Sequence, residues 1–167
     1  VIAIANAIPT MGALSSVNIL KNDIKDEGLQ AMEAVLKKSK MLKSICGASG
    51  AELDLSGQSL GAEDAKLVAV ELKHNGALEK LLMGANGFKG IEAGKALGNA
   101  IAVNTVIKEL DISGGKYNCL QCDAEFVNDF SPGLSANGAM VTVNMMGNKI
   151  GKWRLSKLQE TMKAHRT

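Results

Sequence analysis

The chain has 167 residues, a formal net charge of +2, and hydrophobic residues at 46% of its positions. This length suits one domain with a real core, and the apolar content excludes an intrinsically disordered chain. The small net charge argues against a general nucleic-acid binder, which would carry a strong basic excess. Because aromatic residues make up only 3% of the chain, the core must consist of many aliphatic side chains, as in thin stacked layers.

The cysteines Cys46, Cys119 and Cys122 are odd in number, so any disulfide scheme would leave one unpaired. We therefore expect a reducing, intracellular location, most simply the cytoplasm. The longest apolar stretches fall well short of the ~18–20 residues that a membrane span requires. The sequence thus predicts no membrane span.

A repeat emerges when the chain is compared with itself, because segment 61–81 aligns without a gap with segment 90–110. The shared template is apolar, two variable, apolar, one variable, apolar, two variable, Asn, one variable, apolar. Five copies fit this template, although the second opens with Gly and has Gln for Asn, and the fourth lacks the Asn. They are Leu14/Val17/Ile19/Asn22/Ile24, Gly50/Leu53/Leu55/Gln58/Leu60, Leu78/Leu81/Met83/Asn86/Phe88, Ile107/Leu110/Ile112/Gly115/Tyr117 and Met140/Val143/Met145/Asn148/Ile150.

The apolar-variable-apolar part of the template has the period of two that is typical of a short strand with one buried face. A segment of roughly 12–15 residues with helical spacing follows each copy, as at Ala65, Val68, Ala69 and Leu72. Strand–helix pairs repeated in one direction predict parallel strands with helices along one side. We expect each template Asn to pair with backbone groups where the strand turns away.

The template resembles that of leucine-rich-repeat proteins of the ribonuclease-inhibitor-like class, which includes the Ran GTPase-activating protein and the sensor domains of NOD-like receptors. The segments Met11-Gly12-Ala13-Leu14 and Asn75-Gly76-Ala77-Leu78 are also similar to repeat proteins of algae and other protists. The resemblance implies an α/β fold. This would be a leucine-rich-repeat solenoid of about five strand–helix repeats, with a curved parallel sheet and helices on its convex side.

We expect a single domain over residues 1–167, with 14–151 as the repeats and 152–167 as a basic C-terminal capping helix. Residues 1–13 would be the tail of an incomplete preceding repeat. Because residues 1–9 are apolar and uncharged, we expect the N-terminal face to be covered by a partner or by residues of the same protein absent from this chain.

The spacing of the repeats is uneven, and the interval between the first and second copies is the longest. The equivalent strand positions are Val17, Leu53, Leu81, Leu110 and Val143. The first interval carries about eight extra residues, and insertions in solenoids map to connecting loops. An alternative register would make Leu42 and Ile45 the strand there, and the sequence leaves this boundary open.

The strand side chains that alternate away from the core would line the concave face of the sheet, which is the predicted partner-binding surface. Four carboxylates give this face an acidic bias. Its residues are Ser16, Asn18, Leu20, Glu52, Asp54, Ser56, Lys80, Leu82, Gly84, Glu109, Asp111, Ser113, Thr142, Asn144 and Met146. Trp153 is a possible partner anchor, with packing over the last repeat as the alternative.

No group of residues favours catalysis. The Cys119-Leu120-Gln121-Cys122 motif lacks the further ligands of a zinc site. His74 and His165 fall at predicted helix ends with no nucleophile nearby. The basic run 37–43 is expected to be a solvated helix end. The sequence therefore predicts no catalytic residues, no cofactor and no metal.

These observations predict a non-catalytic protein–protein interaction module. It would be a scaffold or subunit of a larger assembly, or the sensor segment of a larger protein, and its partner would be another protein. An alternative is a regulator of a small GTPase, by resemblance to the Ran GTPase-activating protein. A third possibility is a nucleic-acid or nucleotide binder, although nucleic acid is disfavoured by the charge.

Overall fold

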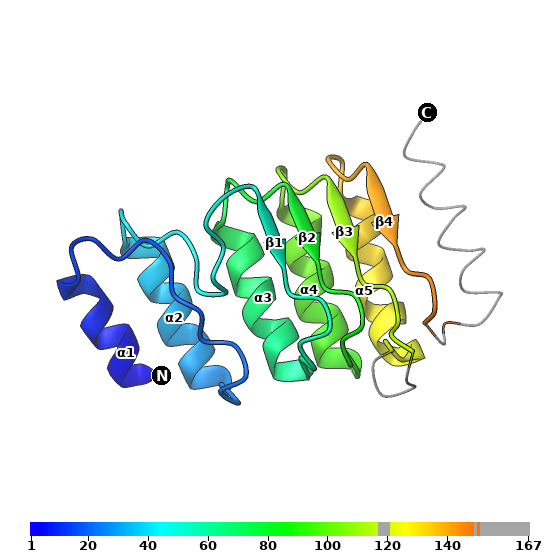
Figure 1. Cartoon of the computed structure of the whole chain (residues 1–167), viewed down its shortest axis with the longest axis horizontal. Helices are drawn as coiled ribbons and strands as arrows, with labels where there is room; N and C mark the ends of the chain where they lie inside the picture. The colour runs from blue at the N-terminus through cyan, green and yellow to red at the C-terminus, as the bar shows by residue number, and fades with distance from the viewer. Residues whose placement is uncertain (117–120, 149, 151–167) are drawn as a thin grey trace.

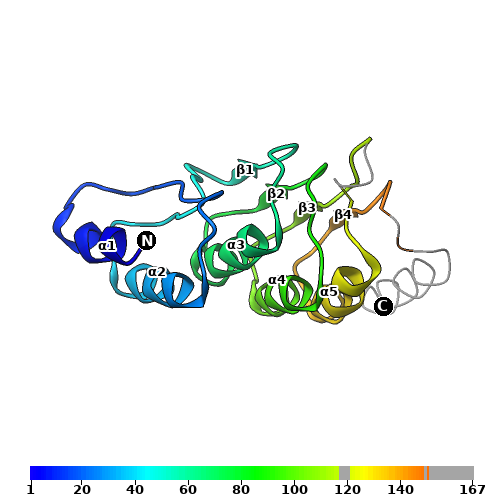
Figure 2. The ribbon, with the colours of Figure 1, turned by 90° about the horizontal axis from the view of Figure 1, so that it is seen from below.

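The computed structural model describes residues 1–116, 121–148 and 150, in which helices alternate with short strands along the chain (Figure 1). The helices are α1 (Ile2–Ala7), α2 (Asp26–Lys38), α3 (Ala62–His74), α4 (Ile91–Val103) and α5 (Ala124–Ala136), with a 3₁₀ turn, η1 (Ile8–Thr10), after α1. The strands are β1 (Glu52–Asp54), β2 (Lys80–Leu82), β3 (Glu109–Asp111) and β4 (Thr142–Asn144). The helices line one side of the molecule and the strands line the other (Figure 2).

Within the described residues, four strands form one parallel sheet in the order β1-β2-β3-β4. The register aligns Leu53, Leu81, Leu110 and Val143 in one row across the sheet. The template predicted this equivalence for its second to fifth copies, and the structure confirms it. In β1, β2 and β3 the central leucine is buried and its two neighbours are more exposed, as a period of two requires.

Helices α3, α4 and α5 pack side by side behind the sheet (Figure 1). The ring of Phe126 stacks between those of Phe88 and Phe130, with centroid distances of 6.0 and 5.6 Å. Where α5 crosses α4, a Cβ atom added to Gly133 would clash with the carbonyl oxygen of Gly98. Only glycine permits this approach of two backbones, so the glycines of these helices serve close packing.

The residue that follows each long helix joins that helix to the next strand segment. Asn104 accepts hydrogen bonds from the backbone N–H groups two and three residues later, at 2.9 and 2.7 Å, and donates to the carbonyl of Leu72 on the preceding helix at 2.7 Å. Asn75 and Asn137 accept the same pair of bonds after α3 and α5, and the hydroxyl of Ser39 does so after α2. Each of these side chains thus pairs with backbone N–H groups of the segment that leads from the helix to the next strand.

The template asparagines have the role that the sequence predicted. The buried Asn86 amide donates to the carbonyls of Leu55 at 2.8 Å and Met83 at 3.0 Å, and its oxygen accepts from the N–H of Leu60 at 3.0 Å. Asn148 likewise donates to a carbonyl of the preceding repeat at 2.7 Å. These bonds tie the end of one strand to the turn of its neighbour.

The first copy of the template does not supply a strand of this sheet, so the expected count of about five repeats is not confirmed. Segment 16–18 pairs instead through isolated bridges, Ser16 with Ser44 and Asn18 with Cys46. Leu53 keeps its predicted place in β1, and the first interval contains in addition a bridge-forming segment around Ile45, the residue that the alternative register put in a strand. The physical reason lies at the end of α2, where Ser39 takes the place of the helix-ending asparagines and puts the buried Leu42 at the opening of a repeat.

Segment 44–46 and β1 do not pair as strands within the described residues. Carboxylates of α3 accept hydrogen bonds from backbone N–H groups there instead. The buried Glu71 accepts from the N–H of Ile45 at 2.7 Å and from the amide of Asn75 at 2.9 Å. Asp64, near the start of α3, accepts from the N–H of Lys21 at 2.7 Å. The backbone N–H groups of Ile45 and Lys21 are thus satisfied by side chains of α3 rather than by a neighbouring strand.

Residues near the N-terminus form α1, which packs on α2, with Ala5 of α1 and Ile8 of η1 buried. A helix was expected there as the tail of a preceding repeat. The predicted capping helix at 152–167, the possible anchor Trp153 and the template residue Tyr117 lie outside the described residues. Among the helices that the structure describes, none is long and apolar enough to cross a membrane.

Replacing Leu81 with alanine should lower the free energy of unfolding by about 2–4 kcal/mol, because this fully buried side chain sits at the centre of the sheet. The matched control is Leu82→Ala, which changes the next residue, on the opposite face of the same strand, and should cost clearly less. Urea unfolding followed by circular dichroism measures both changes. Equal losses would contradict the register.

Replacing Glu71 with glutamine should lower the free energy of unfolding by about 1–3 kcal/mol, because glutamine can accept only one of the two buried hydrogen bonds. The control is Glu79→Gln, at an exposed carboxylate that pairs with Lys108. This change should lower the free energy of unfolding by less than about 1 kcal/mol. A Glu71→Gln protein with the urea midpoint of wild type would show that the junction does not depend on this carboxylate.

Candidate functional site

The concave face is the side of the sheet opposite the helices, and the structure brings together on it the predicted residues of the second to fifth copies (Figure 2). Their positions follow from the period of two, because those of β1, β2 and β3 lie beside a buried leucine and those of β4 lie beside the half-buried Val143. Glu52, Asp54, Glu109, Thr142 and Met146 are exposed, and Lys80, Leu82, Asp111 and Asn144 are half-buried.

The first copy contributes differently. Leu20 is 7% exposed and lies in the core, so it does not line the concave face as expected. Ser16 and Asn18 belong to the segment that pairs with 44–46 rather than with β1. The predicted face is therefore continuous only from β1 to β4.

A row of turns runs along the end of the strands on this face. The side-chain oxygens of Asp54, Asp111 and Asn144 each accept a hydrogen bond from the backbone N–H two residues later, at 2.8, 2.8 and 3.2 Å. Asn18 makes the same turn outside the sheet, at 3.0 Å. One oxygen of each of these side chains is thus used to hold the chain as it leaves the strand.

Leu82 interrupts this row, because it has no side-chain oxygen to close a turn. Two residues later, a Cβ atom on Gly84 would lie 2.7 Å from the hydroxyl of Ser113 and 2.9 Å from a carboxylate oxygen of Asp111. The turn of the β3 repeat therefore packs over the space that Gly84 leaves. The free oxygen of Asp111 accepts from the amide of Asn144 at 2.8 Å, which links the last two strands.

Charge on the concave face is only partly compensated. Lys80 pairs with Glu52 at 3.3 Å, across the first two strands. Hydrogen bonds from the backbone and the hydroxyl of Ser56, with Lys80 nearby, hold the pKa of Asp54 below its usual range. Glu109 makes neither a hydrogen bond nor an ion pair with any described side chain. The face thus offers an excess of carboxylate charge to a partner.

Other candidate residues are buried or paired elsewhere. Burial raises the pKa of the Cys46 thiol well above its ordinary value, and it raises that of Cys122 to about 12. His74 contacts Glu33 at 3.2 Å on the helical side. Burial alone would raise the pKa of Glu33, but hydrogen bonds from His74 and Lys37 lower it. Cys119 and His165 lie outside the described residues, among which no cluster of three His, Cys, Asp or Glu side chains could hold a metal ion.

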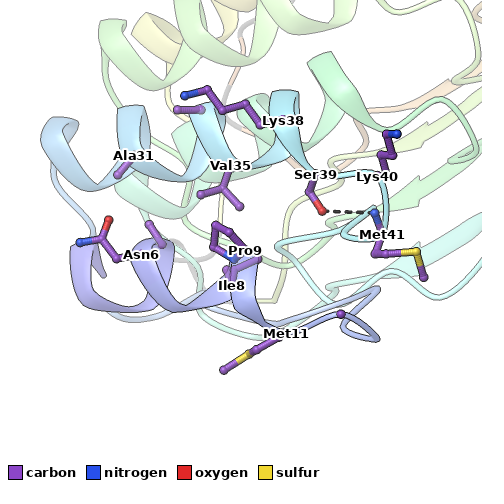
Figure 3. Close-up of a pocket in the computed structure, with 13 residues that line it drawn as sticks. Asn6, Ile8, Pro9, Met11, Ala31, Val35, Lys38, Ser39, Lys40 and Met41 are labelled. Carbon is purple, nitrogen blue, oxygen red and sulfur yellow. Dashed lines mark hydrogen bonds between the residues drawn. The ribbon is translucent and has the colours of Figure 1, made fainter.

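Sequence reasoning assigned the basic run 37–43 to a solvated helix end. The structure places two of its residues, Lys38 and Lys40, at a cleft between α1 and α2 (Figure 3). The signal in the sequence is the pair of small residues Ala31 and Ala34 on the same helix, which leaves space beside the lysines.

Parallel strands backed by helices, joined by buried asparagines at each turn, define a fold of the leucine-rich-repeat type. A scan against known protein families and a search of curated proteins find no match. Among solved structures, a tropomodulin C-terminal domain from Caenorhabditis elegans has a TM-score of 0.53 at 14% identity, covering 98% of this chain and 92% of that chain. The actin-binding site 2 of leiomodin-1 also has a TM-score of 0.53, at 19% identity, covering 98% of this chain and 87% of that chain. At these identities the likeness establishes a shared fold.

The two described thiols should resist alkylation by iodoacetamide at pH 8, because thiolate is the reactive form and both pKa values are raised. Mass spectrometry of a Cys119→Ser variant should find almost no adduct in the native protein and two adducts after unfolding in urea. Because the Cys122 thiol has a pKa near 9 in the unfolded chain and about 12 in the folded chain, the free energy of unfolding should fall as the pH rises from 9 to 12. Below pH 9 the thiol is protonated in both states, and this loss is absent. Rapid alkylation of the native variant at pH 8 would contradict the burial of these thiols.

Proposed function

We propose that this chain is a non-catalytic protein-interaction module whose concave face, from β1 to β4, binds another protein. The observation that supports this most is the row of exposed side chains along the sheet, three of which, Glu52, Asp54 and Glu109, are acidic. The turn hydrogen bonds fix the backbone that carries them, so little order would have to be gained on binding. Met146, which is 79% exposed, and the half-buried Leu82 add apolar contact area.

The chemistry of the described residues supports a non-catalytic role. Asp54 is held in its ionised form at neutral pH, which does not suit a general acid. The thiols of Cys46 and Cys122 are buried and protonated, which does not suit a nucleophile. These free, buried thiols also support our proposal of a reducing, intracellular location.

The partner that we propose carries a basic surface, because the concave face has excess negative charge. The same charge would repel a phosphate backbone, so a nucleic acid on this face is disfavoured. One similar structure is described as an actin-binding site, which makes actin the first named protein to test. The exposed Ile2 and Ile4 on α1 support a further contact at the N-terminal face.

The finer classes remain part of this proposal. A scaffold or subunit of an assembly, or a sensor segment of the ribonuclease-inhibitor-like class, would each use the concave face in the same way. No observation on the described residues favours the regulator of a small GTPase, whose functional residues cannot be matched one by one.

The double change Asp54→Lys and Glu109→Lys should weaken binding to the concave face at least tenfold, because it reverses two exposed charges at a complementary surface. The control is Glu92→Lys with Glu125→Lys, which reverses two exposed charges at the starts of α4 and α5. Capture from a lysate of the source cells with mass spectrometry, together with sedimentation with actin filaments, measures binding. Proteins retained by wild type and the control but lost from the double variant support the proposal. Identical capture by all three proteins would contradict it.

A further inference from the structure

A cleft of about 510 Å³ lies between the N-terminal elements α1 and η1 and the C-terminal half of α2 (Figure 3). This volume is within the range of sites that take up a small ligand or a side chain of a partner. The cleft lies on a part of the molecule that is separate from the strands of the concave face (Figure 1). Any occupant would therefore be bound by different residues.

The floor of the cleft is apolar. Ile8 and Ala5 come from the N-terminal elements, and Val35 comes from α2. The space exists because α2 has the short side chains of Ala31 and Ala34 along this side. The helix α3 has the same length of 13 residues, and its equivalent positions hold the larger Leu67 and Val70.

The rim of the cleft is basic. Lys38 and Lys40 are the charged residues that line it, and neither forms an ion pair with any described carboxylate. The hydroxyl of Ser39 accepts from the N–H of Met41 at 3.2 Å, which helps to fix the loop that carries Lys40 (Figure 3). The positive charges are thus held beside an apolar floor without an internal partner.

Two exposed methionines, Met11 and Met41, come from the loops on either side of the cleft and are 50% and 49% exposed. Methionine side chains are flexible and polarizable, so they adapt to apolar groups of different shape. Large exposed apolar side chains at the edge of an open cleft are typical of a contact surface.

We propose that this cleft binds an acidic segment of another protein, which inserts an aliphatic or aromatic side chain between α1 and α2 while its carboxylates pair with Lys38 and Lys40. Charge complementarity selects this occupant, because an apolar group alone would leave both lysines without partners. This proposal rests on the proposed function in one respect, namely that the chain binds other proteins, here at the cleft rather than at the concave face.

The probe for this proposal is a fluorescein-labelled peptide of twelve residues that has Leu and Phe four residues apart among glutamates. Fluorescence anisotropy with the full chain should give saturable binding that weakens as sodium chloride is added. A peptide with lysines in place of the glutamates should bind at least tenfold more weakly. Equal binding of the two peptides, or no binding of the acidic one, would overturn the proposal.

Variants locate the binding. Lys38→Glu with Lys40→Glu should weaken binding of the acidic peptide at least tenfold. Ala34→Trp should weaken it to the same extent, because the tryptophan side chain fills the cleft. The matched control is Lys89→Glu with Lys95→Glu, at two exposed lysines that do not line the cleft, and it should bind as wild type does. Circular dichroism checks that every variant is folded. If the variant with two glutamates fails to fold, Ala34→Trp still tests the cleft, because it leaves the charge of the protein unchanged.

Other occupants give distinct outcomes. Wild-type affinity in both cleft variants would place the peptide elsewhere and overturn the proposal. Vesicles of phosphatidylcholine and phosphatidylserine, or a twelve-nucleotide RNA, could instead bind more tightly than the acidic peptide. If the cleft variants abolish that binding, the result would also overturn the proposal. A concentration-dependent dimer that Ala34→Trp disrupts, with no peptide binding, would assign the cleft to a second copy of the chain and overturn the proposal too. Peptide binding that survives Asp54→Lys with Glu109→Lys separates this proposal from that of the concave face.

Discussion

Each repeat of this protein can bury its apolar side chains only against the repeats beside it, and the placement of every other element follows from this. A strand of three residues has too little surface for a core of its own, so Leu53, Leu81 and Leu110 are buried by stacking in one row. Stacking also brings the turns of neighbouring repeats side by side. Asn86 and Asn104 then satisfy the backbone groups that those turns leave unpaired, by donating to carbonyls of the preceding repeat.

The need for a neighbour also explains why the junction before β1 matters. Segment 44–46 pairs with the first copy of the template, so β1 has no strand partner from that side among the described residues. Glu71 and Asp64 on α3 accept the backbone donors that a strand would have taken. The N-terminal elements therefore join the rest of the chain through side-chain hydrogen bonds and the shared hydrophobic core rather than through a continuous sheet.

This junction separates two surfaces of opposite charge. The concave face has carboxylates without an ion pair at Asp54 and Glu109, since its single described ion pair joins Lys80 to Glu52. The cleft between α1 and α2 has Lys38 and Lys40 on its rim and an apolar floor. A chain with both surfaces could hold a basic partner and an acidic partner at the same time, as a member of an assembly would.

The repeat, the direction of the strands and their register from β1 to β4 could all be predicted from the amino-acid sequence. The period of two and the recurrence of the template are local patterns that a single chain displays. The same patterns indicated which side chains of those strands face away from the core. The role of the template asparagines followed from the need to pair backbone groups at each turn. The features that depend on pairing between distant segments, in contrast, became visible only in the folded chain. The first copy matches the template as well as the others do, yet its partner is segment 44–46, and this choice buries Leu20. The acceptor for the N–H of Ile45 is a distant side chain, at Glu71, which no local pattern reveals. The cleft likewise arises where two helices meet around small residues. Local periodicity specifies which face of a segment is buried, but the neighbour that buries it is selected by packing in three dimensions.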